Sequence, residues 1–221
     1  FGLVIAFSAT VLIERISRTV KVSKFSFTQA LRLFVVLLLT GFLLMLAARI
    51  VIVAYIIVLM FLIGKRVSSS YWRAIIVSIL GLVSLAALFT VPILSDRMME
   101  LFDATSNSTN VRVMIYDCSL ELAKEHWLFG AGLERLQFIL DMCYGQFTAV
   151  NGETYFQYNT HNEYLNVLCG KGIIGLMAFL GLLILLFRKV SRNALGVAFL
   201  VLFCFTCLTE NLLDRQFGVF F

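Results

Sequence analysis

Two arginines and a histidine are the residues of this sequence best suited to chemistry. Arg49 interrupts a long apolar run, Arg112 lies in a polar stretch, and His161 stands where that stretch ends. An arginine guanidinium binds phosphate through two parallel hydrogen bonds. A histidine can take a proton from a hydroxyl near neutral pH. Together, these residue types indicate transfer to or from a phosphate-linked group.

Each of the three residues also has a purely structural interpretation. Arg49 could be a boundary residue whose charged end reaches the membrane surface. Arg112 could form a surface ion pair with Glu100 or Asp117. His161 could be an exposed residue in the first turn of a helix. The residue types alone leave both interpretations open.

Other polar residues give weaker signals. Glu210 and Arg215, near the end of the chain, are supporting candidates that could simply pair with each other. His126 precedes Trp127 at a predicted helix end, where a cation suits the helix dipole, so it is interpreted as structural. The five cysteines show no zinc-binding spacing, and no metal site is predicted.

The segment Thr160-His161-Asn162-Glu163-Tyr164-Leu165 marks the start of a helix. Thr160 and Glu163 have the spacing of a capping box, with Thr160 as N-cap and Glu163 reaching back to it. This pattern places His161 in the first helical turn, pointing into water. Gly170-Lys171-Gly172 then predicts a break, and residues 173–187 form an apolar span.

Composition identifies an integral membrane protein. The chain has 221 residues, of which 61% are hydrophobic and 14% are charged, whereas a soluble domain has about 25% charged residues. Several apolar runs approach the ~17–25 residues that cross a bilayer. The net charge of +5 does not suggest a nucleic-acid partner, because the basic residues gather in particular loops between apolar runs.

These basic residues predict the topology. They cluster at 14–32, 64–73 and 188–192, which places those three loops on the cytoplasmic side and residues 95–160 on the outer side. Residues 33–63 could be one helix about 46 Å long, but that would bury Arg49 in the membrane. Two short antiparallel spans, 33–48 and 50–63, place Arg49 at the outer boundary and are preferred.

The outer segment is predicted to be helical in part. Asn110 can cap a helix from Val111 to about Trp127, which Gly130-Ala131-Gly132 ends, and a second short helix covers 133–140. Cys118 and Cys143 share this segment and could form a disulfide in an oxidising compartment. The sequence leaves that pairing open.

A family resemblance adds to this interpretation. The segment from Thr160 to Leu165, followed by Gly172-Ile173-Ile174-Gly175-Leu176, resembles the signature of the bacterial O-antigen ligase and O-antigen polymerase superfamily. Residues 208–218 are also similar to members of that family, as is Arg112 followed by Trp127 and residues 129–132. The resemblance covers about residues 31–221. One departure is Ala48, since the family commonly has serine before the arginine at the outer turn.

The resemblance implies a metal-independent glycosyl transfer with no cofactor. The donor would be a glycan on undecaprenyl pyrophosphate, and the acceptor a sugar or a lipid A core. Arg49 and Arg112 would hold the pyrophosphate and stabilise the charge that develops on it. His161 would be the general base or would orient the acceptor. Asn162 and Glu163 would set the helix start and the orientation of the ring.

The predicted fold is an all-α integral membrane protein, a polytopic transmembrane helix bundle with one large helical periplasmic loop. Residues 1–94, including a span at 74–94, hold transmembrane spans and basic cytoplasmic loops. Residues 95–160 form the periplasmic loop region, and residues 161–221 hold the His-Asn helix and the last spans. Both chain ends lie in apolar runs, so a fragment of a larger multi-span protein is expected.

The predicted function is a membrane glycosyltransferase whose active face is periplasmic, in the bacterial inner membrane. Ligase and polymerase activities are not separated by these residues. A transporter or flippase for a lipid-linked glycan is the alternative, but it would place charges along a cavity reachable from both sides. A non-catalytic membrane assembly partner is a third possibility.

Overall fold

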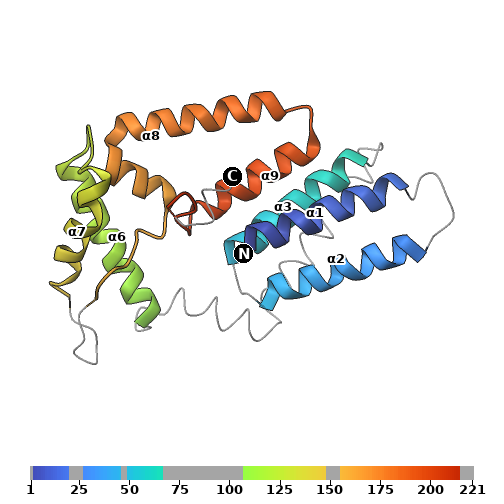
Figure 1. Cartoon of the computed structure of the whole chain (residues 1–221), viewed down its shortest axis with the longest axis horizontal. Coiled ribbons are helices and arrows are strands. Elements are labelled where there is room, and N and C mark those ends of the chain that lie inside the picture. The colour runs from blue at the N-terminus through green and yellow to red at the C-terminus, as the bar shows by residue number, and fades with distance from the viewer. Residues whose placement is uncertain (1, 20–26, 46–48, 67–106, 148–154, 215–221) are drawn as a thin grey trace. The chain divides into compact units, whose positions relative to one another are not determined.

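The structure, a computed structural model, contains helices and no strand among the residues that it describes (Figure 1). Those residues are 2–19, 27–45, 49–66, 107–147 and 155–214. The chain forms two compact units. The first comprises Phe1–Met98 and Phe187–Thr206, and the second comprises Met99–Leu186 and Cys207–Phe221.

Four helices of the first unit lie among the described residues. They are α1 (Gly2–Thr19), α2 (Phe27–Met45), α3 (Arg49–Arg66) and α9 (Ala194–Thr206). Helix α1 contacts the other three, and α3 also contacts α9. Ala6, Ala54 and Ala198 are fully buried, and such small side chains let helix backbones approach closely.

The prediction of two helices instead of one continuous helix over 33–63 is confirmed. Helix α2 ends at Met45 and α3 begins at Arg49. The hydroxyls of Thr40 and Tyr55, which are nearly equidistant from the break, are hydrogen-bonded at 3.2 Å. The two helices therefore run in opposite directions (Figure 1) and meet at this hydrogen bond.

The predicted loop over 14–32 is wrong at both ends. At its end, α2 already begins at Phe27. Helix α1 continues to Thr19, and Glu14 is buried within it. Thr10 and Glu14, one turn apart, lie on the same buried face, so the acidic residue belongs to the helical packing and not to a loop. The span predicted at 74–94 lies outside the described residues.

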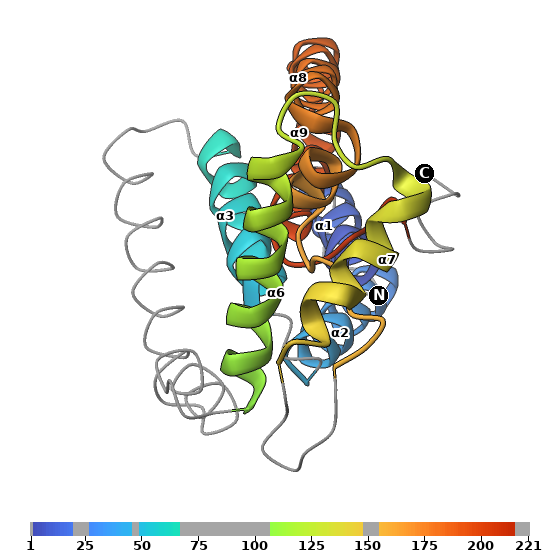
Figure 2. The same cartoon turned by 90° about the vertical axis from the view of Figure 1, so that its left-hand side faces the viewer.

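Helices α6 (Asn107–Glu125) and α7 (Leu133–Tyr144) pack side by side in the second unit (Figure 2). A disulfide between Cys118 and Cys143 joins them, so the structure forms the pair that the sequence left open. The hydrophobic core between them and the start of α8 is made by Met114, Ile115, Cys118, Leu122, Ala123, Leu136, Leu140, Tyr144 and Cys169. Burial raises the pKa of the Tyr144 phenol, which therefore stays neutral within this core.

Both helices predicted in this region exist, with different bounds. Helix α6 begins at Asn107, so Asn110 lies inside it and is not its N-cap, and α7 extends four residues beyond the predicted end. Ile115 and Leu122 of α6 are buried, whereas Val113 and Leu120 are exposed. The disulfide at Cys118 fixes which face of α6 turns toward α7.

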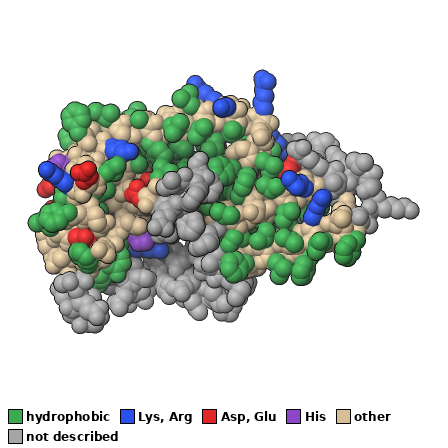
Figure 3. All heavy atoms as spheres, in the orientation of Figure 1, with side chains coloured by type: hydrophobic (Ala, Val, Ile, Leu, Met, Phe, Trp, Pro, Cys, Tyr) green, Lys and Arg blue, Asp and Glu red, His purple; other side chains and the backbone are tan. Residues whose placement is uncertain are grey.

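Helix α8 (Glu163–Val190) is kinked at Gly172, where the predicted break is confirmed. Among the described residues, it is the one helix long and apolar enough to cross a membrane; α2, α3 and α9 are apolar but shorter. Its surface exposes large apolar side chains such as Met177 and Leu185. Figure 3 shows hydrophobic side chains over much of the visible surface.

Candidate active site

Asn162 caps the start of α8. Its side-chain oxygen accepts a hydrogen bond from the Leu165 N–H at 3.1 Å, as an N-cap residue does for the exposed amides of the first turn. The predicted capping box is wrong: Thr160 lies two residues before the cap, and the Glu163 carboxylate does not reach back to it. Both side chains instead bind a distant part of the chain.

His161 lies just before the helix and not in its first turn. Its φ is +47°, in the left-handed region that side chains with a Cβ rarely adopt. The side chain of Asn159 accepts a hydrogen bond from the His161 N–H at 3.1 Å, and the residue is half-buried. Strained backbone of this kind persists only where its surroundings hold it, and it occurs often at functional sites.

Thr160 is held by the segment of residues 207–214, which we call the C-terminal strap. Thr160 and Asn211 are both fully buried. The Asn211 amide donates to the Thr160 hydroxyl at 3.1 Å, and that hydroxyl donates to the Asn162 carbonyl at 3.0 Å. The residue before His161 is therefore fixed to a part of the chain 51 positions away.

Glu163 and Asn166 extend this contact along α8. The Glu163 N–H donates to the Cys207 carbonyl at 2.8 Å, and its carboxylate accepts from the Leu213 N–H at 2.9 Å. The Asn166 amide donates to the Asp214 carboxylate. Glu163 is only 1% exposed, so its role is to hold the strap. His161 thus lies between two residues that the strap immobilises.

An open groove of about 330 Å³ adjoins Asn162. Its lining is mainly apolar and includes Tyr116 and Leu120 from α6 and Tyr164, Leu165, Leu168 and Leu176 from α8. Arg112 is exposed on α6 one turn before Tyr116, and side chains four residues apart share a helix face. Arg112 therefore lies on the helix that forms one wall of this groove.

The connection between α6 and α7 is bound to the kink in α8. The Cys169 carbonyl accepts from the Ala131 N–H at 2.8 Å, and the Gly170 carbonyl accepts from the Gly132 N–H at 3.1 Å. The Ile173 N–H donates to the Trp127 carbonyl at 2.8 Å. We call residues 127–132 the clamp loop. It supplies partners for backbone groups that the kink removes from the helical ladder.

A model of the family described as O-antigen ligase matches residues 34–180, two thirds of the chain. The chain belongs to the O-antigen ligase family. No curated protein matches it. The resemblance at the His-Asn segment is thereby confirmed, and the coarse activity follows from it: a membrane enzyme of the ligase or polymerase kind.

The match to the O-antigen ligase family includes Arg49, Arg112 and His161. Arg49 begins α3, in the first unit, and its side chain lies outside the described residues. Arg112 and His161 both belong to the second unit. The convergence of the two arginines on His161 stays a prediction.

The supporting candidates lie around the strap. Asn162 and Glu163 are beside His161, and Glu210 is half-buried within the strap itself. Arg215 lies outside the described residues. The strap comes after residues 34–180, which the O-antigen ligase model matches. Its hydrogen bonds to Thr160 and Glu163 nevertheless fix the backbone around His161, which lies within the matched segment.

Sequence reasoning missed Thr160 and Asn211 as a pair, and Asn166 and Asp214 as another. Thr160 was assigned to a local cap, and Asn211 was grouped with the end of the chain only by resemblance. The available signal was polarity at Asn166, because an asparagine between two apolar residues needs a hydrogen-bonding partner when it is buried. Nothing in local spacing names that partner.

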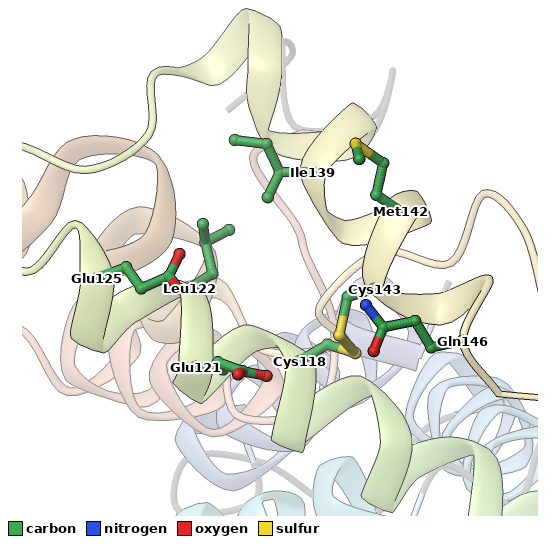
Figure 4. Close-up of a pocket in the computed structure, with 8 residues that line it drawn as sticks. All are labelled: Cys118, Glu121, Leu122, Glu125, Ile139, Met142, Cys143 and Gln146. Atoms are coloured by element: carbon green, nitrogen blue, oxygen red, sulfur yellow. A yellow bond between two sulfur atoms is a disulfide. The ribbon is translucent and has the colours of Figure 1, made fainter.

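A second cavity, of about 220 Å³, lies between α6 and α7 beside the disulfide (Figure 4). Its polar lining consists of Glu121, Glu125 and Gln146. Among the described residues, no group of three or more His, Cys, Asp or Glu side chains could hold a metal ion. We assign no step of the chemistry to this cavity.

Proposed function

We propose that this protein transfers a glycan from undecaprenyl pyrophosphate to a hydroxyl of an acceptor glycan, with His161 as the general base. The observation that carries the proposal is the geometry around His161. It is the histidine of a segment in the family match, it has a left-handed backbone, and it is fixed on both sides by buried polar contacts to the C-terminal strap. A histidine that served only as an exposed helix-start residue would need none of this support.

The reaction is a displacement at the anomeric carbon of the donor sugar. The acceptor oxygen forms the new glycosidic bond while the bond from that carbon to the pyrophosphate oxygen breaks. Undecaprenyl pyrophosphate leaves with the electron pair, and His161 takes the proton of the attacking hydroxyl. Proton removal by a positioned base contributes typically 10²–10⁴-fold to such a rate.

The leaving group needs positive charge close to its phosphates. Arg112 and Arg49 are the proposed ligands, because a guanidinium can bind a phosphate through two hydrogen bonds and stays protonated throughout. Arg112 is supported by its place on the helix that lines the groove beside Asn162. Arg49 is supported by its position at the first residue of α3, where a helix start also favours a nearby anion.

The proposed site faces the periplasm from the bacterial inner membrane. The disulfide between Cys118 and Cys143 supports this side, because disulfides persist in oxidising compartments. Arg188 and Lys189 at the far end of α8 support a cytoplasmic position for that end. The chain is proposed to form part of a polytopic helix bundle, with α2, α3 and α9 as further spans.

Replacement of His161 by alanine tests the proposal. In cells that lack the native gene, the full-length His161→Ala protein should lose at least ~99% of surface glycan transfer, because the base is absent. Glycans separated on a gel and stained give the measurement. His126→Ala is the matched control, since His126 is the only other histidine in this sequence and is exposed just after α6.

Normal glycan length and amount in the His161→Ala strain, at equal expression, would overturn the role of His161. A loss of glycan in the His126→Ala strain of similar size would mean that the assay reports folding instead of catalysis. The gel also separates the two activities: loss of all attached polymer indicates a ligase, whereas a single repeat unit on the core indicates a polymerase.

A further inference from the structure

The clamp loop and the first residue of α7 expose large apolar side chains. They are Trp127 (60% exposed), Leu128 (37%), Phe129 (73%) and Leu133 (54%). We call these four residues the anchor patch. Scattered single apolar residues on a surface are ordinary, but four large exposed apolar side chains within seven residues, two of them aromatic, indicate a surface that a partner covers.

The anchor patch is fixed to the start of the apolar part of α8. The Trp127 carbonyl accepts a hydrogen bond from Ile173, the first residue after the kink, at 2.8 Å. A Cβ at Gly172 would lie 2.2 Å from the Leu128 carbonyl oxygen, so the two backbones are in direct contact there. The patch therefore keeps a fixed position along the axis of α8.

The length of α8 places that position at the edge of a bilayer. From Ile173 to Val190 the helix is about 27 Å long at 1.5 Å per residue, close to the ~30 Å hydrocarbon core of a bilayer. One end carries the exposed Arg188 and Lys189. The other end carries the anchor patch together with the exposed Lys171.

Aromatic rings beside a lysine at the end of an apolar span are the composition of a membrane interface. Tryptophan is enriched at the level of the lipid headgroups, and lysine there extends its ammonium toward the phosphates. The exposed apolar surface of α8 begins directly after the kink, with Ile174 and Met177. The anchor patch thus lies at the level along α8 where the surface that lipid chains would cover begins.

We propose that the anchor patch inserts into the interfacial layer of the bilayer at the kink of α8, where the apolar part of the helix begins. The clamp loop then binds lipid through Trp127 and Phe129, and it holds the candidate site at headgroup depth. A donor whose pyrophosphate lies among the headgroups would meet the site at that level. The inference concerns lipid contact and is independent of the chemistry proposed for His161.

Quenching of tryptophan fluorescence by brominated lipids tests this inference. The full-length protein is reconstituted in phosphatidylcholine vesicles whose acyl chains carry bromine either near the glycerol end or near the chain middle. The difference between the wild-type and Trp127→Phe emission isolates Trp127, whatever other tryptophans contribute. We expect that difference to fall at least about twofold with shallow bromine and less with deep bromine, because the ring lies at the interface.

A second reporter guards against a local effect of the substitution. In the Trp127→Phe background, Phe129→Trp places the fluorophore two residues away within the same patch, and it should show the same preference for shallow bromine. The inference fails if both reporters are quenched by aqueous iodide and not by brominated lipid. It also fails if both are shielded from lipid and from iodide, which would mean that a protein surface, such as a second copy of this chain, covers the patch.

Discussion

At the scale of single residues, the site depends on buried polar groups that have nothing to do with bond making. Thr160, Glu163 and Asn211 are nearly inaccessible, and each is bonded across a gap of about 50 positions in sequence. A buried polar group without its partner costs about 1–3 kcal/mol. Because these partners meet only in the folded molecule, the backbone conformation at His161 depends on the tertiary structure. Small changes beside His161 should therefore alter turnover.

Thr160→Val removes one oxygen atom and keeps a branched side chain of nearly the same size. Asn211 then loses its acceptor, so we expect a stability loss of about 1–3 kcal/mol and a fall in kcat of about tenfold or more, since misplacement of a catalytic group by about 1 Å can cost ~10². Thr160→Ser, which keeps the oxygen, should restore most of kcat. The measurement is kcat and KM of the purified full-length protein with a lipid-linked glycan.

Thermal unfolding in detergent accompanies the kinetics of both variants. A positioning role lowers kcat with little change in the KM for donor. An unchanged kcat in the folded Thr160→Val protein would remove Thr160 from the positioning role and leave the role of His161 to its own test.

At the scale of elements, the two glycine-containing breaks form one joint. Gly130 and Gly172 both have positive φ, and a Cβ at Gly130 would lie 2.4 Å from the Gly170 carbonyl carbon. The backbones of the clamp loop and α8 touch because neither has a side chain at that point. The joint sets the angle at which the first part of α8, with Asn162 and Glu163, meets the apolar part.

Gly172→Ala should therefore open this joint. The added methyl meets the Leu128 backbone, and alanine disfavours the glycine-only backbone angles at 172 (φ 67°, ψ −169°), so we expect a loss of about 2 kcal/mol or more. Gly181→Ala is the control in the same helix, where a Cβ has nothing within 4 Å. Midpoints of thermal unfolding in detergent give the comparison, and equal midpoints for the two variants would rule out the close contact.

At the scale of the whole molecule, α8 links a region with a disulfide to a basic helix end. Cys118 and Cys143 are joined before the span, while Arg188 and Lys189 end it. Oxidising chemistry and the positive-inside tendency predict that these two regions lie on opposite sides of the membrane. The family is one of membrane enzymes, and this asymmetry predicts the direction in which α8 is inserted.

Labelling of introduced cysteines tests that direction. Lys124 and Arg192 are both exposed, one before and one after α8. In intact spheroplasts, Lys124→Cys should react with a membrane-impermeant maleimide, and Arg192→Cys should react only after the membrane is permeabilised. The unmodified chain supplies the background from Cys204. Labelling of Arg192→Cys alone in intact spheroplasts would reverse the topology and with it the periplasmic site.

The sequence by itself determined the helical and apolar character of the described elements, the division of residues 33–63 into two helices, the kink at Gly172 and the family. These features are written in local spacing and hydropathy, which act over a few neighbouring residues. Tertiary structure alone decided that Asn162 caps α8, that Thr160 binds Asn211, that Glu163 holds the strap and that the clamp loop meets the kink. Local patterns cannot name a partner some 40 to 50 positions away, because a buried polar group takes whichever partner packing brings within reach.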